Sequence, residues 1–339
     1  MAFEICFGHR THLKTKMNMQ VYFAPLEGIT DAVYRRAHFQ LFGGVSKYFI
    51  PFLSPTQDRR LTTRELRAVA PQENRGLPAV PQILTKDPSL FLWLTVQLRD
   101  MGYSEVNLNL GCPSGTVTAK GKGSGMLQDP DALRRFLDAV FAASPLPVSI
   151  KTRIGYVDES EWEALWEVLH VYPMLEIILH PRTRREFYRG PVHMQVFEKL
   201  SETCRSPLVY NGDLFDLPSA RMFAERFPGV QTVMCGRGLA ANPALAREIA
   251  GGLQLHREEL YAFHETIYRE YARLYDDRIV LGKMRDIVKY LACCYVSPRK
   301  ALKAVFKART PEEYTQAVQI LMSRDLREHP GYSEADDQL

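Results

Sequence analysis

The sequence lacks several patterns that would place it in common functional classes. None of its six cysteines forms a C-x-x-C pair, which argues against a zinc knuckle and against a thioredoxin-type redox site. No run approaches the roughly 18 apolar residues of a membrane span, and the N-terminal stretch lacks the apolar core of a secretory signal. We therefore expect a cytoplasmic protein with reduced thiols, no membrane association and no bound metal.

The turn after the first predicted strand also lacks the glycine-rich sequence of a doubly wound dinucleotide-binding sheet. Residues 24–28 read A-P-L-E-G where that fold would need G-x-G-x-x-G. The bulk composition, 46% hydrophobic and 24% charged, is ordinary for a globular protein. A formal net charge of +4 is only a weak indication of an anionic partner, because a sum over the chain does not locate the charge.

Short apolar segments alternate with amphipathic segments of helix length over most of the chain. Strict alternation of this kind predicts a parallel sheet, and eight apolar segments predict its closure into a (β/α)₈ TIM barrel over residues 19–252. The predicted strands are 20–25, 45–50, 79–84, 105–110, 148–152, 175–180, 208–210 and 232–235. The predicted helices between them are 31–42, 89–101, 130–143, 160–172, 192–203 and 218–227.

The pattern changes after residue 252, where no convincing strand occurs. Four amphipathic stretches predict a small all-helical C-terminal domain over residues 253–327. Residues 1–18 are expected to be an N-terminal extension outside the fold, and residues 328–339 a flexible polar tail.

Basic residues are concentrated in the helical part. Between residues 278 and 309, nine basic residues accompany a single acid, Asp286. Exposed helices usually mix both signs, so this imbalance favours a surface for a phosphate backbone over an ordinary solvated face. The nine residues are Arg278, Lys283, Arg285, Lys289, Arg299, Lys300, Lys303, Lys307 and Arg309.

Nearly every predicted strand ends in polar or conformationally special residues. Catalytic groups of a TIM barrel lie at the C-terminal ends of the strands, so a ligand is expected at the barrel mouth. The strand ends include Pro25, Gln82, Asn109, Lys151, Arg153, His180, Arg182, Thr183, Asn211, Asp213 and Arg237.

The loops after the seventh and eighth strands match a phosphate site. They read N-G-D at residues 211–213 and C-G-R-G at 235–238, in the position where TIM barrels usually bind phosphate. Glycines allow backbone amides to approach an anion closely, and Arg237 adds charge. An inward-facing Lys151 suits an anionic or electron-rich partner such as a flavin. His180 is either a cofactor contact or a structural histidine, and the following Arg182 and Thr183 favour the former.

Cys112 precedes a long, basic, glycine-rich loop, residues 114–125, which is expected to be a mobile flap over a substrate. A cysteine there could be a metal ligand, a nucleophile or a proton donor. No cysteine or histidine cluster and no papain-type signature accompanies it. A thiol that titrates near 8.5 suits a general acid at neutral pH.

These motifs resemble those of the dihydrouridine synthases over residues 19–325. The stretches that carry the resemblance are A-P-L-E-G-I-T-D at 24–31, L-N-L-G-C-P-S at 108–114, G-S-G-M-L at 123–127, V-S-I-K-T-R-I-G at 148–155, N-G-D at 211–213, and M-C-G-R-G at 234–238 followed by N-P at 242–243. The resemblance implies FMN as cofactor, NADPH as reductant and transfer RNA as substrate. It also implies hydride transfer from the flavin to C6 of uridine, with a proton from Cys112 to C5.

The resemblance also implies roles for individual residues. Those implied for flavin binding are Pro25, Leu26, Gln82, Lys151, His180, Asn211, Gly212, Asp213, Gly236 and Arg237. Asn109 and Arg153 would face the uracil, and Arg182, Thr183 and Arg184 would lie nearer the RNA, which Lys283, Arg299, Lys300 and Lys303 would contact from the helical domain.

Two positions depart from the family pattern. Pro181 stands where relatives usually have glycine, which removes a backbone N–H next to His180. Gly115 stands where relatives often have lysine, so one RNA contact is expected to be missing. An alternative reading is an FMN barrel that acts on free pyrimidines, similar to dihydroorotate or dihydropyrimidine dehydrogenases. A monomer is expected, because a large RNA must reach the mouth.

Overall fold

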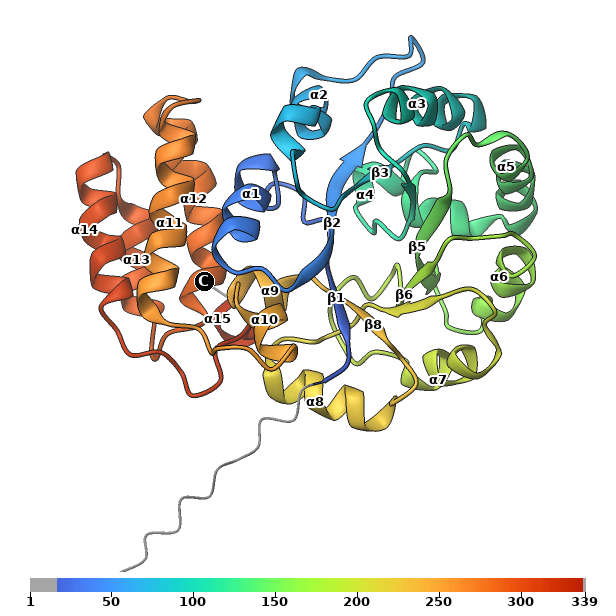
Figure 1. Ribbon diagram of the computed structural model, residues 1–339. Coiled ribbons are helices and arrows are strands. Elements are labelled where there is room, and N and C mark those ends of the chain that lie inside the picture. The colour runs from blue at the N-terminus through green and yellow to red at the C-terminus, as the bar shows by residue number, and fades with distance from the viewer. Residues whose placement is uncertain (1–16, 338–339) are drawn as a thin grey trace, which may run out of the picture.

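Eight parallel strands close into a barrel in chain order, and β1 pairs with β8 to complete it (Figure 1). The computed structural model describes residues 17–337, so the expected extension lies outside the described residues except for its last two. The strands are β1 (Gln20–Phe23), β2 (Val45–Leu53), β3 (Ala79–Ile83), β4 (Val106–Leu110), β5 (Val148–Gly155), β6 (Ile177–Thr183), β7 (Leu208–Tyr210) and β8 (Thr232–Cys235). The predicted (β/α)₈ TIM barrel is therefore confirmed.

Most helices of the barrel form its outer ring, whereas α4 (Gly115–Thr118) lies inside that ring near β3 and β5 (Figure 1). The others are α1 (Ala32–Leu41), α2 (Thr63–Val69), α3 (Pro88–Asp100), α5 (Pro130–Ala143), α6 (Glu161–Leu169), α7 (Met194–Thr203), α8 (Leu217–Arg226), α9 (Arg237–Ala241) and α10 (Leu245–Ile249), with 3₁₀ turns η1 (Pro71–Asn74) and η2 (Gly123–Gln128). Their starts follow simple capping rules. Asp129, for example, accepts the backbone N–H of Ala132 at 2.9 Å, and Pro130 follows it at the first helical position.

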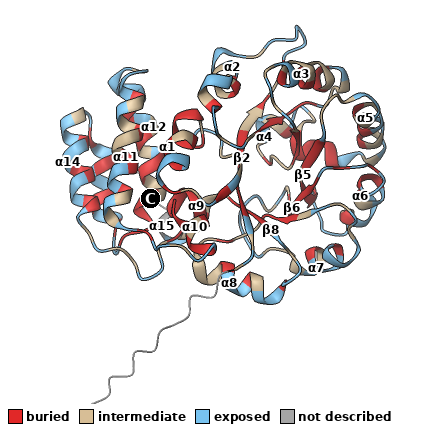
Figure 2. Ribbon diagram, viewed as in Figure 1, coloured by how far each residue is buried: buried red, intermediate tan, exposed pale blue. Residues whose placement is uncertain are grey.

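Side chains alternate along the strands between the inside of the barrel and the layer under the helices. On β1, Val21 and Phe23 pack beneath the helices, whereas Tyr22 packs inside the barrel with Phe49 and Met234. Buried residues accordingly fill both the barrel and the inner faces of the helices (Figure 2). The barrel is a filled core whose functional surface is its open end.

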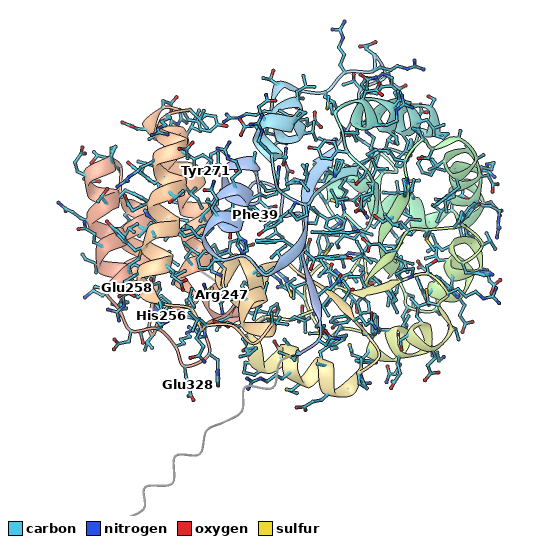
Figure 3. The ribbon with its side chains drawn as sticks, viewed as in Figure 1. Phe39, Arg247, His256, Glu258, Tyr271 and Glu328 are labelled. Atoms are coloured by element: carbon cyan, nitrogen blue, oxygen red, sulfur yellow. The ribbon has the colours of Figure 1, made fainter. Side chains whose placement is uncertain are left out.

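The C-terminal helices are α11 (Arg257–Ala272), α12 (Asp277–Ala292), α13 (Arg299–Lys307) and α14 (Pro311–Met322), and they form one bundle beside the barrel (Figure 1). In this bundle α11 packs against α1 and α12 packs against α9. Tyr271, labelled in Figure 3, donates its hydroxyl to Asp31 at the N-terminus of α1 at 2.8 Å. Arg247 of α10 pairs with Glu259 of α11 at 2.7 Å. The helical part is thus attached to the barrel by buried and charged contacts. Among residues 17–337, no helix is long and apolar enough to cross a membrane.

The chain after residue 328 differs from the expected flexible tail. Tyr332 is only 7% exposed, and its backbone N–H donates to the carbonyl of Phe215 at 3.2 Å. The Asn242 side chain donates to the carbonyl of Pro330 at 3.1 Å. A short helix, α15 (Glu334–Asp337), follows. Because the segment is mostly polar, its composition did not indicate that Tyr332 packs onto the loops after β7 and β8.

Candidate active site at the barrel mouth

A cavity of about 390 Å³ opens at the C-terminal ends of the strands, within the size range of roughly 300–1,000 Å³ that small-molecule sites occupy. All the residues predicted to perform catalysis or hold the cofactor line it, together with Asn109 and Arg153. They are Pro25, Leu26, Gln82, Cys112, Lys151, His180, Asn211, Gly212, Asp213, Gly236 and Arg237. The structure therefore brings these residues together, and their individual roles remain predictions.

The backbone that carries Cys112 is held by the side chain of Asn109. The side-chain oxygen of Asn109 accepts the N–H groups of Gly111 at 3.1 Å and Cys112 at 2.9 Å, and the Asn109 amide donates to Gln82 at 2.7 Å. Burial raises the pKa of the Cys112 thiol above its ordinary value. The thiol is therefore protonated at neutral pH and faces the cavity as a potential proton donor.

The loop after Cys112 differs from the expected mobile flap, because it folds into α4 and η2 and packs against the cysteine. The hydroxyl of Ser124 donates to the Cys112 carbonyl at 2.8 Å. Gly123 adopts a φ of +58°, and a Cβ there would lie 3.1 Å from the Cys112 Cβ. Both the positive φ and the short distance disfavour a side chain at this position, so glycine at residue 123 reflects close packing against the cysteine.

Lys151 is half-buried at the cavity wall, and within the described residues its amine forms no ion pair with a carboxylate. Desolvation, with a smaller contribution from Arg153, lowers the pKa of Lys151 to about 7. His180 is buried, and the pKa of its imidazole lies well below the ordinary value because of desolvation and the neighbouring cations. His180 is therefore neutral and Lys151 only partly protonated near pH 7, and the lasting positive charge of the cavity wall comes from Arg153 and Arg237. An anionic or electron-rich ligand would favour the protonated form of Lys151.

Asp213 links two arginines at the base of the predicted phosphate loops. Its carboxylate accepts hydrogen bonds from Arg182 at 2.8 Å and from Arg237 at 2.9 Å. Arg182, predicted to lie near the RNA, is 1% exposed, and its guanidinium also donates to the Gly190 carbonyl. Arg182 thus lies behind the cavity wall and does not line the cavity.

The two predicted phosphate-loop glycines differ in the space around them. A Cβ on Gly212 would lie 2.0 Å from the Tyr210 hydroxyl, so this position requires glycine, whereas one on Gly236 would lie in ordinary contact, 3.5 Å from Ala24 and Leu26. The Asn211 amide donates to the Met234 carbonyl at 2.8 Å. This bond ties the end of β7 to β8 and fixes the spacing of the two loops.

Pro181 occupies an irregularity in β6. Arg153 pairs with His180 and Gly155 with Thr183, so Pro181 and Arg182 together stand opposite one residue of β5. This is a β-bulge, a position that tolerates a residue without an N–H. The departure from the family pattern is therefore accommodated in the strand without displacing His180 from the cavity.

The remaining residues predicted to contact RNA lie in two places. Thr183 donates to Glu186, and Arg184 lies over the rings of Tyr156 and Phe187 outside the cavity lining. Lys283 pairs with Asp31 at 3.0 Å. Arg299, Lys300 and Lys303 are exposed on α13.

Tyr188 lines the cavity and was not predicted. Its ring lies 5.2 Å from the Arg153 guanidinium and 5.3 Å from that of Arg237, and stacks on His180 with centroids 6.0 Å apart. It belongs to the segment between β6 and α7, which carries no recognisable motif. Only its aromatic type within the basic run R-T-R-R-E-F-Y-R at residues 182–189 could have drawn attention to it.

Comparison with known proteins decides the family. The model for "Dihydrouridine synthase (Dus)" matches residues 22–324. The chain belongs to the dihydrouridine synthase family. The match covers the barrel and the C-terminal helices together, so the resemblance noted in the motifs extends over the whole fold.

Several dihydrouridine synthase relatives share about three-tenths of their residues with the chain. A probable tRNA-dihydrouridine synthase of Staphylococcus aureus is 29% identical over 265 residues, which is 74% of this chain and 77% of that protein. One of Staphylococcus epidermidis is 30% identical over 257 residues, 69% of this chain and 75% of that protein.

Among solved structures, a morphinone reductase mutant in complex with tetrahydroNAD matches with a TM-score of 0.50 and 11% identity, over 72% of this chain and 90% of that one. At this identity the likeness concerns the fold alone. No group of three or more metal-binding side chains occurs within residues 17–337.

Proposed function

We propose that this dihydrouridine synthase reduces the C5=C6 bond of specific uridines in tRNA to 5,6-dihydrouridine, with FMN as cofactor and NADPH as reductant. The observation that supports this most directly is the shared cavity of Cys112, a protonated thiol, and Lys151, a half-buried amine without a carboxylate partner among the described residues. Family membership supports the tRNA substrate. NADPH rests on the resemblance of the motifs.

The residues present fit a flavin mononucleotide. The amine of Lys151 is desolvated and its pKa is about 7, so it would suit a contact with the electron-rich N1–C2=O edge of an isoalloxazine. Gln82 is anchored by Asn107 and Asn109, and it offers an amide to the ring system. The glycine backbones of the β7 and β8 loops and Arg237 match the phosphate. When bound in its reduced form, FMN supplies the hydride that C6 of the uracil accepts.

Cys112 completes the reduction by giving its proton to C5. The thiol is suited to this step because burial keeps it protonated, while Lys151 and Arg153 nearby favour the thiolate that remains. Asn109 fixes the backbone on which the thiol is mounted. Arg153, whose guanidinium donates to the carbonyls of Gly111 and Thr183, holds the loop after β4 against the end of β6.

The uracil must leave its stack in the folded RNA to reach this cavity. Tyr188 at the cavity wall offers a ring on which an extruded base can stack. The exposed Lys300 and Lys303 of α13 would contact phosphates of the RNA. Specificity for one uridine would then come from how the RNA docks on both parts of the protein.

The test is an assay of purified protein with unmodified tRNA and NADPH. Wild-type protein should carry a yellow flavin and produce dihydrouridine, and Cys112→Ala should keep the flavin and produce little. A second candidate, reduction of free pyrimidines, is favoured by a cavity volume that suits a small molecule, but it leaves the basic face of α13 without a role. A protein without flavin, or turnover of free dihydropyrimidines with none on tRNA, would contradict the proposal.

A further inference from the structure

The guanidinium of Arg237 is enclosed by aromatic rings from three separate segments. It lies 4.8 Å from the ring centroids of both Phe215 and Tyr332 and 5.3 Å from that of Tyr188. Aromatic faces attract a guanidinium and restrict its orientation. Tyr332 belongs to the C-terminal segment, almost one hundred residues after Arg237 in the chain.

The position of Tyr332 is set by its neighbouring backbone. Its N–H donates to the Phe215 carbonyl at 3.2 Å, and the preceding Pro330 carbonyl accepts from Asn242 at 3.1 Å. A Cβ at Gly331 would lie only 2.4 Å from the Phe215 carbonyl, so the two backbones could not approach this closely with another residue there. The segment is therefore fitted to the loop after β7.

The same segment brings a negative charge to Arg237. A carboxylate oxygen of Glu334 lies 3.5 Å from an Arg237 nitrogen, and its side chain is 60% exposed. Asp213 lies at 2.9 Å and is more buried. An exposed ion pair of this length contributes little, so Glu334 can be displaced by a stronger anion, whereas Asp213 is fixed by Arg182 as well.

We propose that residues 330–334 form part of the site for the phosphate of the cofactor. Tyr332 is a positioning residue that holds the Arg237 guanidinium toward the phosphate, and Glu334 is a resident anion that the phosphate displaces. This inference rests on the proposed function, because it takes FMN as the ligand. It adds a segment outside the barrel to the site. Tyr332 is expected to strengthen phosphate binding, and Glu334 to weaken it.

The effects of Tyr332 and Glu334 on the phosphate can be separated from a general loss of stability by comparing two ligands. Riboflavin has the same ring system as FMN and no phosphate, so a contribution through Arg237 should appear with FMN and not with riboflavin. A variant that merely loosens the fold would weaken both ligands alike. The ratio of the two dissociation constants therefore reports the phosphate end alone.

The experiment measures flavin fluorescence on titration of flavin-free full-length protein with FMN and with riboflavin. Tyr332→Ala should raise the Kd for FMN about tenfold, consistent with loss of a partly desolvated cation–π contact, and leave that for riboflavin within about twofold. Tyr332→Phe should restore wild-type binding, because the ring is retained. Glu334→Gln should lower the Kd for FMN about twofold to threefold through loss of a weak competing ion pair.

Tyr261→Ala is the matched control, because Tyr261 is exposed on α11. Circular dichroism and the Tm confirm that each variant is folded. Equal FMN binding by wild type and Tyr332→Ala, or equal losses for FMN and riboflavin, would overturn the inference. Failure of wild-type protein to bind FMN at all would instead contradict the proposed function, so the two failures are distinguishable.

Discussion

The side-chain oxygen of Asn109 accepts the backbone N–H of Cys112 at 2.9 Å. The same oxygen accepts the N–H of Gly111, so the turn that carries the thiol is fastened to the end of β4 by one side chain. Because this contact acts on the backbone, it fixes the position of Cys112 without engaging the sulfur. The thiol remains available to a substrate.

Asn109→Ala should therefore impair the chemical step more than cofactor binding. Loss of both backbone contacts lets the Cys112 loop shift, and a misplacement of about 1 Å costs on the order of 10²-fold in rate. We expect the single-turnover rate of dihydrouridine formation to fall by about that factor. The Kd for FMN should rise less, through the lost contact to Gln82. Asn109→Asp, which keeps the acceptor oxygen, is the control, and equal rates for Asn109→Ala and wild type would show that the contact is dispensable.

The pH profile should reflect the raised pKa of Cys112. The active form is the protonated thiol, and burial favours that form, so activity should persist to higher pH before it declines than an ordinary thiol, which titrates at about 8.5, would allow. Cys112→Ser should lower the rate and abolish this alkaline decline, because a serine hydroxyl does not titrate there. Any decline near pH 7 that survives in Cys112→Ser belongs to another group, such as Lys151. A thiol-dependent decline well below pH 8 would contradict this assignment.

Loss of the basic residues on α13 should weaken RNA binding and leave the chemical step nearly unchanged. The double variant Lys300→Glu, Lys303→Glu should raise KM for tRNA by about tenfold or more and leave kcat nearly unchanged. The salt dependence of binding should become shallower, because fewer phosphates are neutralised. Lys199→Glu, an exposed change on α7, is the matched control. An unchanged KM and salt dependence would exclude α13 from the RNA interface.

Asp213→Ala should destabilise the protein even when no ligand is bound. Arg182 is 1% exposed, and this substitution removes the carboxylate that compensates its buried charge. Removal of one partner of such a pair costs about 3–5 kcal/mol. Urea unfolding of flavin-free protein measures the loss. Glu198→Ala, which removes a pair with Arg226 that is half exposed, should cost less than about 1 kcal/mol.

Lys151→Met should stabilise the flavin-free protein while weakening flavin binding. Its folded-state pKa, about 7, lies below its unfolded value of roughly 10.4. The unfolded state therefore binds more protons between these values, and the unfavourable contribution of Lys151 is complete at pH 6 and shrinks as pH rises through that window. The gain in Tm should be larger at pH 6 than at pH 9.5. Lys199→Met is the control, and a loss of Tm at both pH values would contradict the assignment.

Much of the fold could be predicted from local patterns. Apolar segments of three to six residues identified all eight strands, because a barrel strand is buried on both faces and needs no alternation. The strand ends then identified the cavity lining, since barrel closure brings those ends together whatever the loops do. Lys151, Asn211 and Arg237 were predicted for this reason, from order along the chain.

What escaped prediction depends on contacts between distant segments. The loop 114–125 reads as mobile because it is rich in glycine, yet Gly123 and Gly125 are buried against Cys112 and Thr118. The sequence suggests an exposed RNA contact for Arg182, and its burial is explained by the partner Asp213, which lies in the loop after the next strand, β7. Composition describes a segment alone and carries no information on what it packs against.

The return of Tyr332 to the loop after β7 also bears on the order of folding. In a growing polypeptide the barrel is complete once β8 has emerged at Cys235, long before Pro330 is added. A barrel folded at that stage would hold Arg237 without the ring that faces it. Tight retention of the flavin would thus begin after the C-terminal helices are made, so that cofactor loading follows synthesis of the RNA-facing part of the chain.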